Sequence, residues 1–324
     1  MPARQINNIP DEPYLHLLEK VDFTPIFIMG DHRSGTTALY QILVATECFN
    51  YLKASHIIKY DEILDSNING TQERTRQELK KLFKSLEISD RLFDKVKPTP
   101  DLPEEYGFIL ENAGYESYLN PENLFLFTQL CKKIQFASNS DKPLLLKNPW
   151  CFPHFMYIKS VLPKAKFVFI HRHPLHVMNS KLKAVCLMLS VESPYTQLIS
   201  KRYHEIFDNP MRRLLFRVLY SSLFGLGVRR VTQKSMLATS YYLENINSLP
   251  TTDYISIKYE DLCQSPESTI LKVLEFLQLE AKTTVDYDNL IATRPLKLLP
   301  EVQNSYDEIC RKLQLYLVHC GYQV

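Results

Sequence analysis

Short apolar runs alternate with longer amphipathic stretches along most of the chain. The runs have the length of buried strands, which are predicted at 25–29, 49–52, 143–146, 167–170 and 254–258. Helices are predicted over 36–46, 71–93, 121–136 and 301–319, and from Pro174 and Pro266 onward. Strands that alternate with helices indicate a mostly parallel sheet covered on both faces. The predicted fold class is therefore α/β, with a parallel central sheet flanked by helices.

The length of the chain suits one domain. With 324 residues, of which 45% are hydrophobic, a sizeable core is available. We expect a single domain over 1–324, with its core at about 25–277 and helical insertions at about 71–140 and 190–245. The formal net charge of +2 gives no bulk attraction to nucleic acid or to an anionic membrane, so any preference for anions must be local.

The sequence shows no sign of export. The first 25 residues are polar and resemble neither a secretory signal nor an anchor, and no apolar run reaches the roughly 18 residues that a spanning helix needs. The seven cysteines are scattered, with no C-x-x-C pair. They are expected to be reduced packing residues in a cytoplasmic protein, without a disulfide framework or a metal site.

A phosphate-binding loop follows the first predicted strand. Gly30 and Gly35 occupy the glycine positions of the spacing G-x-x-x-x-G-K-[ST], and Thr37 occupies the hydroxyl position. The lysine position is Thr36, so the group that reaches the β- and γ-phosphates of a nucleoside triphosphate is absent. Backbone N–H groups and the helix N-terminus still favour a phosphate, and Arg33 adds a charge. The loop indicates a nucleotide ligand and argues against ATP hydrolysis.

Three predicted strands end beside a basic residue: Arg33 in the loop, Lys147 and Arg172. The carboxyl ends of parallel strands meet at one edge of the sheet, where ligands bind. These residues are therefore expected to form a site for a ligand with several anionic groups. Ser180 lies two turns into the helix after Arg172 and can reach the same phosphate. The alternative interpretation is that Arg172 is a solvated polar strand end.

In these motifs the chain resembles sulfotransferases that use 3′-phosphoadenosine 5′-phosphosulfate (PAPS), in particular a branch with an R-S-G-T-T loop. Residues 33–37 match that loop, and Arg172-His173-Pro174 with Ser180 matches a second signature, R-[DN]-P followed by a serine. His173 stands where an acidic or amide residue is more usual. Lys147-Asn148-Pro149 is similar to the family's strand-end K-[ST]-P, and Tyr259-Glu260-Asp261-Leu262 matches its Y-E-D-L.

The resemblance implies a P-loop NTPase-like fold, PAPS as co-substrate and 3′,5′-bisphosphoadenosine (PAP) as product, without a metal. It places the helical insertions on the acceptor side. Its implied nucleotide-binding residues are Arg33, Ser34, Gly35, Thr36, Thr37, Arg172, Ser180 and Tyr259. Lys147 is implied to lie near the sulfuryl group, where it and Arg33 stabilise the charge that develops on the leaving oxygen.

The general base is harder to assign, because the chain departs from the family here. Many relatives carry a glutamate just after the second strand, where this chain has Ala54. His56 is predicted as the base that deprotonates the acceptor, since its ordinary pKa suits the role, with Asp61 or Glu62 as alternatives. A lone histidine is also often a packed or surface residue.

Two other functions remain open: a P-loop nucleotide kinase and a catalytically inactive nucleotide-binding protein. The expected reaction is transfer of a sulfuryl group from PAPS to a hydroxyl or an amine of an acceptor. The sequence does not identify that acceptor among small molecules, carbohydrates, peptides and lipids. Nucleic acid is not an expected partner, and the oligomeric state is open. Residues 211–230 are apolar with basic flanks and either pack over the acceptor cleft or lie on a membrane. Trp150 is either core or acceptor wall.

Overall fold

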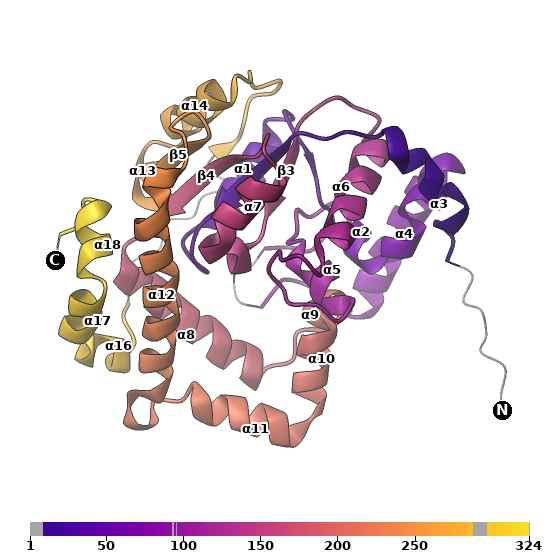
Figure 1. Cartoon of the computed structure of the whole chain (residues 1–324). Helices are drawn as coiled ribbons and strands as arrows, with labels where there is room; N and C mark the ends of the chain where they lie inside the picture. The colour runs from indigo at the N-terminus through magenta and orange to yellow at the C-terminus, as the bar shows by residue number, and fades with distance from the viewer. Residues whose placement is uncertain (1–8, 93, 95, 288–296, 324) are drawn as a thin grey trace.

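One parallel sheet organises the molecule. The computed structural model describes residues 9–92, 94, 96–287 and 297–323. Its sheet has five strands in the order β2-β3-β1-β4-β5, all in parallel pairs (Figure 1). The strands are β1 (Pro25–Met29), β2 (Asn50–Tyr51), β3 (Leu144–Lys147), β4 (Lys166–His171) and β5 (Tyr254–Lys258).

The register brings the predicted basic strand ends to one edge. Ile28 of β1 pairs with Lys147 of β3 and with Val168 of β4, so β1 and β3 end close to one level and β4 continues to His171. The chain leaves the central strand β1 directly into the glycine-bounded loop. Since β3 and β4 lie on opposite sides of β1, the loop sits at a point where the strand order reverses, which is where open α/β sheets bind ligands.

Helices surround this sheet and extend below it in Figure 1. The first half of the chain forms α1 (Thr36–Ala45), α2 (Ala54–Ile58), α3 (Ile63–Ile68), α4 (Gln72–Ser85), α5 (Gly107–Asn112), α6 (Leu124–Ser138) and α7 (Phe155–Val161). The second half forms α8 (Pro174–Ser190), α9 (Pro194–Ile199), α10 (Lys201–Asp208), α11 (Pro210–Leu219), α12 (Leu226–Asn245), α13 (Tyr259–Gln264), α14 (Pro266–Leu277), α16 (Pro300–Asn304), α17 (Tyr306–Lys312) and α18 (Gln314–His319). The 3₁₀ segments are η1 (Glu12–Lys20), η2 (Tyr60–Glu62), η3 (Pro149–His154), η4 (Leu223–Gly225) and η5 (Ile246–Ser248).

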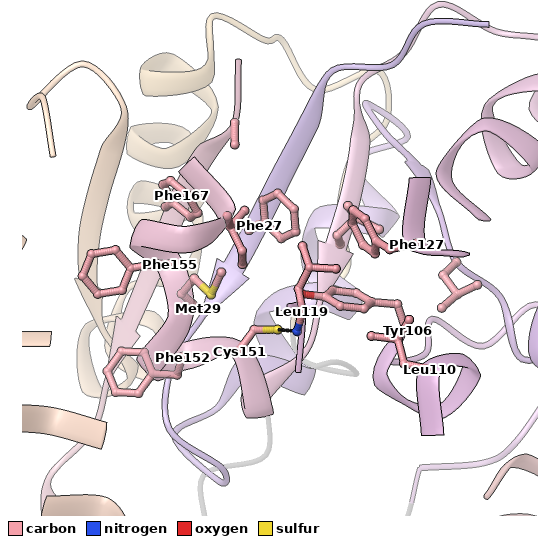
Figure 2. Close-up of a cluster of buried hydrophobic side chains, with 14 of the residues drawn as sticks. Phe27, Met29, Tyr106, Leu110, Leu119, Phe127, Cys151, Phe152, Phe155 and Phe167 are labelled. Carbon is pink, nitrogen blue, oxygen red and sulfur yellow. Dashed lines mark hydrogen bonds between the residues drawn. The ribbon is translucent and has the colours of Figure 1, made fainter. Parts of the chain in front are cut away.

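Alternate side chains of the strands build two cores. On one face Ile28 and Ile170 pack with α1 and α14. On the other face Phe27 and Phe167 join an aromatic cluster with α6, α7 and η3, which Figure 2 shows. Because the strands are buried on both faces, their sequences read as continuous apolar runs. A third cluster joins α8 and α12 to the C-terminal helices and supports the helical part below the sheet.

The predicted fold class is confirmed, while several element boundaries differ from the predictions. The helix predicted over 71–93 ends at Ser85, because Glu87 adopts a left-handed conformation (φ 52°). The amide of Ile88 then donates a hydrogen bond to the carbonyl oxygen of Phe83, and the Ile88 side chain packs on the core. The helix predicted over 301–319 is divided into α16, α17 and α18, with breaks at Ser305 and Leu313.

Candidate active site

The loop after β1 has a backbone shape that only glycine permits at the two glycine positions of its motif. Gly35 has φ 106° and precedes the first turn of α1, and a Cβ there would collide with the ring of Tyr259. A Cβ on Gly30 would lie 2.7 Å from the carbonyl oxygen of Ile170. Between them Arg33 holds a left-handed φ of 71°, a conformation that costs a non-glycine residue on the order of 1–3 kcal/mol. The loop is thus a preformed cradle at a helix N-terminus.

A buried ion pair ties the loop to the helices beyond it. Asp31 Oδ1 lies 2.5 Å from Lys181 Nζ of α8, and the Ser235 hydroxyl of α12 donates to Asp31 Oδ2 at 2.5 Å. Lys181 also donates to Ser235 Oγ at 2.6 Å. Burial alone raises the pKa of Asp31, but the Lys181 ammonium outweighs it and holds this pKa below its usual range. The loop, α8 and α12 are therefore joined by one buried polar network.

The basic residues of the loop and of β4 meet on the other side of the cradle. Arg33 Nε donates to Ser180 Oγ at 3.1 Å, and Arg172 Nη1 donates to the carbonyl oxygen of Arg33 at 3.2 Å. The Arg172 guanidinium lies 4.3 Å from the centre of the Tyr259 ring. Two buried donors, Arg172 Nε and Ser34 Oγ, have no hydrogen-bond partner among the described residues. This end of the site is suited to an anion that satisfies them.

A lysine–carboxylate pair stands at the start of α1. Lys147 Nζ lies 2.9 Å from Thr37 Oγ1 and 2.7 Å from Glu105 Oε1, and both Lys147 and Glu105 are buried. Burial raises the pKa of Glu105, but the Lys147 ammonium outweighs it, so the carboxyl pKa lies below its usual range. His32 is close to this pair, and mainly burial lowers its pKa to about 4. Both Glu105 and His32 are therefore unprotonated at neutral pH.

Most of these groups line one cavity of about 980 Å³. Lys147 and Ser34 are buried and are not among its lining residues. The predicted site residues that line it are Arg33, Gly35, Thr36, Thr37, Arg172, Ser180 and Tyr259. Glu105, His32 and Trp150 line it as well. Away from the loop the walls are largely apolar and come from α8 to α12, with Ala184, Val185, Met188, Leu189, Ile199, Ile206, Phe216, Tyr220 and Val231. The cavity thus combines basic groups beside the loop with many apolar side chains from α8 to α12, and Glu111, Arg202 and Lys234 line it too.

The comparisons with known proteins agree with this geometry. A model described as Sulfotransferase family matches residues 25–283. The chain belongs to the sulfotransferase family. The match covers the whole sheet and the cavity helices. It therefore excludes the alternative function of a P-loop nucleotide kinase. This sulfotransferase is therefore an enzyme of sulfuryl transfer.

Solved structures share its fold. Sulfotransferase STF9 from Mycobacterium avium superposes with a TM-score of 0.59 at 13% identity, over 98% of this chain and 81% of that one. Sulfotransferase STF1 from Mycobacterium tuberculosis H37Rv gives a TM-score of 0.58 at 13% identity, over 94% and 80%. A comparison of the sequence with curated proteins gives no match. Among the described residues of the sulfotransferase, no helix is long and apolar enough to cross a bilayer.

The residue predicted as general base lies elsewhere. His56, in the first turn of α2, is not among the side chains that line the cavity. Its Nδ1 faces the backbone amide of Lys53 at 3.3 Å, and chiefly burial lowers its pKa to about 3, which corrects the expectation of a near-neutral group. Asp61 and Glu62, in η2, do not line the cavity either, and Glu62 pairs with Lys59 at 2.9 Å.

Sequence reasoning did not identify several charged groups that line the cavity of the sulfotransferase. Glu105 lies in a segment rich in proline and without helical or strand periodicity, so no pattern connects it to Lys147. Asp31 and Lys181 each stand next to a predicted site residue, but their pairing is a contact across 150 positions of the chain. Trp150 lines the cavity, and contact with an acceptor there stays a prediction.

Proposed function

We propose that this enzyme transfers the sulfuryl group of PAPS to a hydroxyl group of an acceptor held in the apolar part of the cavity, and releases PAP. The observation that carries the proposal is the Lys147 ammonium, fixed between the Thr37 hydroxyl and the Glu105 carboxylate at the start of α1. A cation, a helix N-terminus and a carboxylate then meet where the donor and the acceptor hydroxyl would react.

The nucleotide would lie along the loop, and the residues present fit it. The cradle formed by Gly30 and Gly35 gives backbone N–H groups to the 5′-phosphosulfate, with Ser34, Thr36 and Thr37 beside it. Arg172 and Ser180 would hold the 3′-phosphate, because the buried Arg172 Nε still lacks a hydrogen-bond partner among the described residues. Tyr259 packs against both Gly35 and Arg172 and would border the nucleotide.

The chemistry follows from charge. As the acceptor oxygen bonds to sulfur, the bond from sulfur to the bridging phosphate oxygen breaks, and negative charge develops on that oxygen. Lys147 and Arg33 are proposed to stabilise this charge. The acceptor proton passes to Glu105, which is an unprotonated carboxylate at neutral pH, and Lys147 turns from Glu105 toward the leaving oxygen. His32 completes the wall beside the pair and orients the acceptor together with Trp150, whose ring centre lies 4.9 Å from that of His32.

The test compares Glu105→Gln with the wild type in transfer of label from radiolabelled PAPS to a panel of hydroxyl acceptors. We expect a loss of turnover of roughly 10²–10⁴-fold with PAP affinity unchanged, because the base is removed and the nucleotide contacts stay. The matched control is His56→Ala, which should keep near-normal turnover. The wild-type rate should be level between pH 6 and 8, since the pKa values of Glu105 and His32 lie below that range.

Two outcomes contradict this assignment. Normal turnover of Glu105→Gln would remove Glu105 as the base. A rate that rises through pH 6.5 and loses that rise in His56→Ala would return the role to His56. Absence of any labelled product across the panel, together with no PAP binding, would contradict the proposed function itself.

A further inference from the structure

Helix α11 presents an apolar face to solvent. Met211, Leu214, Leu215 and Val218 follow the i, i+3, i+4, i+7 spacing of one helix face, and their exposed fractions are 75%, 57%, 57% and 43%. In a globular protein this face ordinarily packs on the core. Figure 1 shows α11 along the lower edge of the molecule, beneath α8 and between α10 and the lower end of α12.

The turn after α11 extends this face. Leu223, Phe224 and Leu226 are 58%, 89% and 38% exposed. Phe224 has a φ of 49°, a region that bulky residues rarely adopt, so the backbone holds an aromatic ring outward at the tip of the turn. We call the side chains of Met211, Leu214, Leu215, Val218, Leu223, Phe224 and Leu226 the α11 surface. Contiguous exposed apolar patches of this kind mark sites of interaction with proteins or membranes.

The charge around the α11 surface is mainly positive, although the exposed Glu205 of α10 pairs with Arg212 at 3.6 Å. No aspartate or glutamate occurs between Asp208 and Glu244. The exposed cations of this stretch are Arg212, Arg217, Arg229, Arg230 and Lys234. The whole chain has a formal net charge of only +2, so this basic surface is a local feature. Apolar side chains with flanking arginines are the arrangement by which a helix lies in an anionic membrane interface.

A second copy of the chain fits this surface less well. Symmetric pairing through α11 would place the basic flanks of the two copies against each other, because an isologous interface brings the same patch together. Like charges across an interface oppose association. An anionic bilayer complements both the apolar face and its arginines.

The same helix also borders the cavity. Phe216 of α11 and Tyr220 line the cavity together with Ile206 of α10. The wall continues along α8 through Val185 and Met188 toward the loop. The α11 surface and this part of the cavity wall are therefore on two sides of one element. Polar residues such as Tyr203 and Lys234 line the cavity beside these apolar side chains.

We propose that the α11 surface docks on an anionic lipid bilayer and that the acceptor is a hydroxyl-bearing amphiphile taken from that bilayer. The acceptor part rests on the proposed function. Its hydroxyl oxygen bonds to the sulfur of PAPS as the bond to the bridging oxygen breaks, its proton passes to Glu105, and PAP leaves. The amphiphile's apolar part lies against α8 and α11.

The docking test is flotation with vesicles of phosphatidylcholine, with and without phosphatidylglycerol. The wild type should bind the anionic vesicles. Vesicle affinity should fall about fivefold in Arg217→Gln and about fivefold in Arg229→Gln, since each cation near an anionic surface contributes about that factor. Leu215→Ser with Phe224→Ser should reduce binding at least about tenfold, because the inserted apolar area is lost.

A matched control uses apolar residues that are equally exposed elsewhere. Phe125 and Leu315 are 79% and 78% exposed, on α6 and α18, and Phe125→Ser with Leu315→Ser should bind vesicles like the wild type. Equal melting temperatures of the variants would show that folding is retained. The docking proposal is overturned if the wild type does not bind anionic vesicles, or if both double variants bind equally. In a third outcome the wild type sediments as a dimer, the variant with Leu215→Ser and Phe224→Ser sediments as a monomer, and neither binds vesicles. This result would overturn docking and assign the α11 surface to contact with a second copy of the chain.

The acceptor part is tested by label transfer from PAPS to straight-chain alcohols of increasing length. We expect kcat/KM to rise with chain length, because each added methylene enters the apolar cavity and contributes about fourfold. Equal rates for short and long alcohols would overturn this part. PAP calorimetry on the same samples separates the two proposals: without PAP binding the proposed function fails, whereas PAP binding without vesicle binding leaves that function standing and refutes docking.

Discussion

At the scale of single residues, the site depends on contacts that fix cations before any nucleotide arrives. Arg172 lies on the Tyr259 ring and donates to the carbonyl oxygen of Arg33, and Arg33 in turn donates to Ser180. The tyrosine ring can approach so closely because position 35 has no Cβ. The Arg172 guanidinium is thereby held in one orientation, so little side-chain entropy remains to be lost when it binds a phosphate.

Arg172→Ala should weaken PAP binding by about 1.5–3 kcal/mol, the value of one charge-assisted contact. Because this contact is assigned to the 3′-phosphate, the preference for PAP over adenosine 5′-phosphate should shrink by the same amount. Calorimetric titration of both nucleotides measures this. A preference that stays the same in the variant would place the 3′-phosphate elsewhere in the site.

At the scale of elements, the buried pair of Asp31 and Lys181 couples the phosphate loop to α8 and, through Ser235, to α12. These two helices also provide walls of the cavity. Their packing with the C-terminal helices in the third core cluster holds the acceptor end in place. The position of the loop and the shape of the acceptor end are therefore set by the same contact.

Lys181→Met should lower the free energy of unfolding by about 3–5 kcal/mol, because it leaves the Asp31 charge buried without its cation. Adding Asp31→Asn should recover much of this loss. The stabilisation is present at neutral pH and disappears as the pH falls through the lowered pKa of Asp31, below its ordinary value of 3.8. Urea denaturation measures these effects.

The exposed pair of Lys164 and Asp22 serves as the control, since Lys164→Met should change the free energy of unfolding by less than about 1 kcal/mol. Similar effects of the Lys181 and Lys164 replacements would show that the buried pair is not a structural tie.

The elements show how far the sequence could lead. The buried strands, the loop and the helix that begins at Thr36 were predictable, because period and glycine spacing are local signals. The proximity of Arg33, Lys147 and Arg172 followed from parallel topology. The Glu105 pairing was not predictable, since it depends on how an irregular segment returns to the sheet, and no local rule describes that path. His56 does not line the cavity, and its contact with the Lys53 amide, three residues away, is a local one at the start of α2.

At the scale of the whole molecule, the cavity of the enzyme is lined by basic groups near the sheet and by many apolar side chains from α8 to α12. The chain has a formal net charge of only +2, but its basic residues gather locally at the strand ends and around α11. Residues 211–230 were expected either to cover the cleft or to lie on a membrane. They contribute Phe216 to the cavity wall and expose Leu214 and Leu215 to solvent.

The central claim is that the loop binds an adenosine nucleotide with separate 5′- and 3′-phosphates and does not favour one with a γ-phosphate. Calorimetric titration of the wild type with PAP without metal, and with ATP and Mg²⁺, tests it most directly. We predict that PAP binds in the micromolar range, about −8 kcal/mol, and that ATP with Mg²⁺ binds at least tenfold more weakly. Tighter binding of ATP with Mg²⁺ than of PAP would contradict the account.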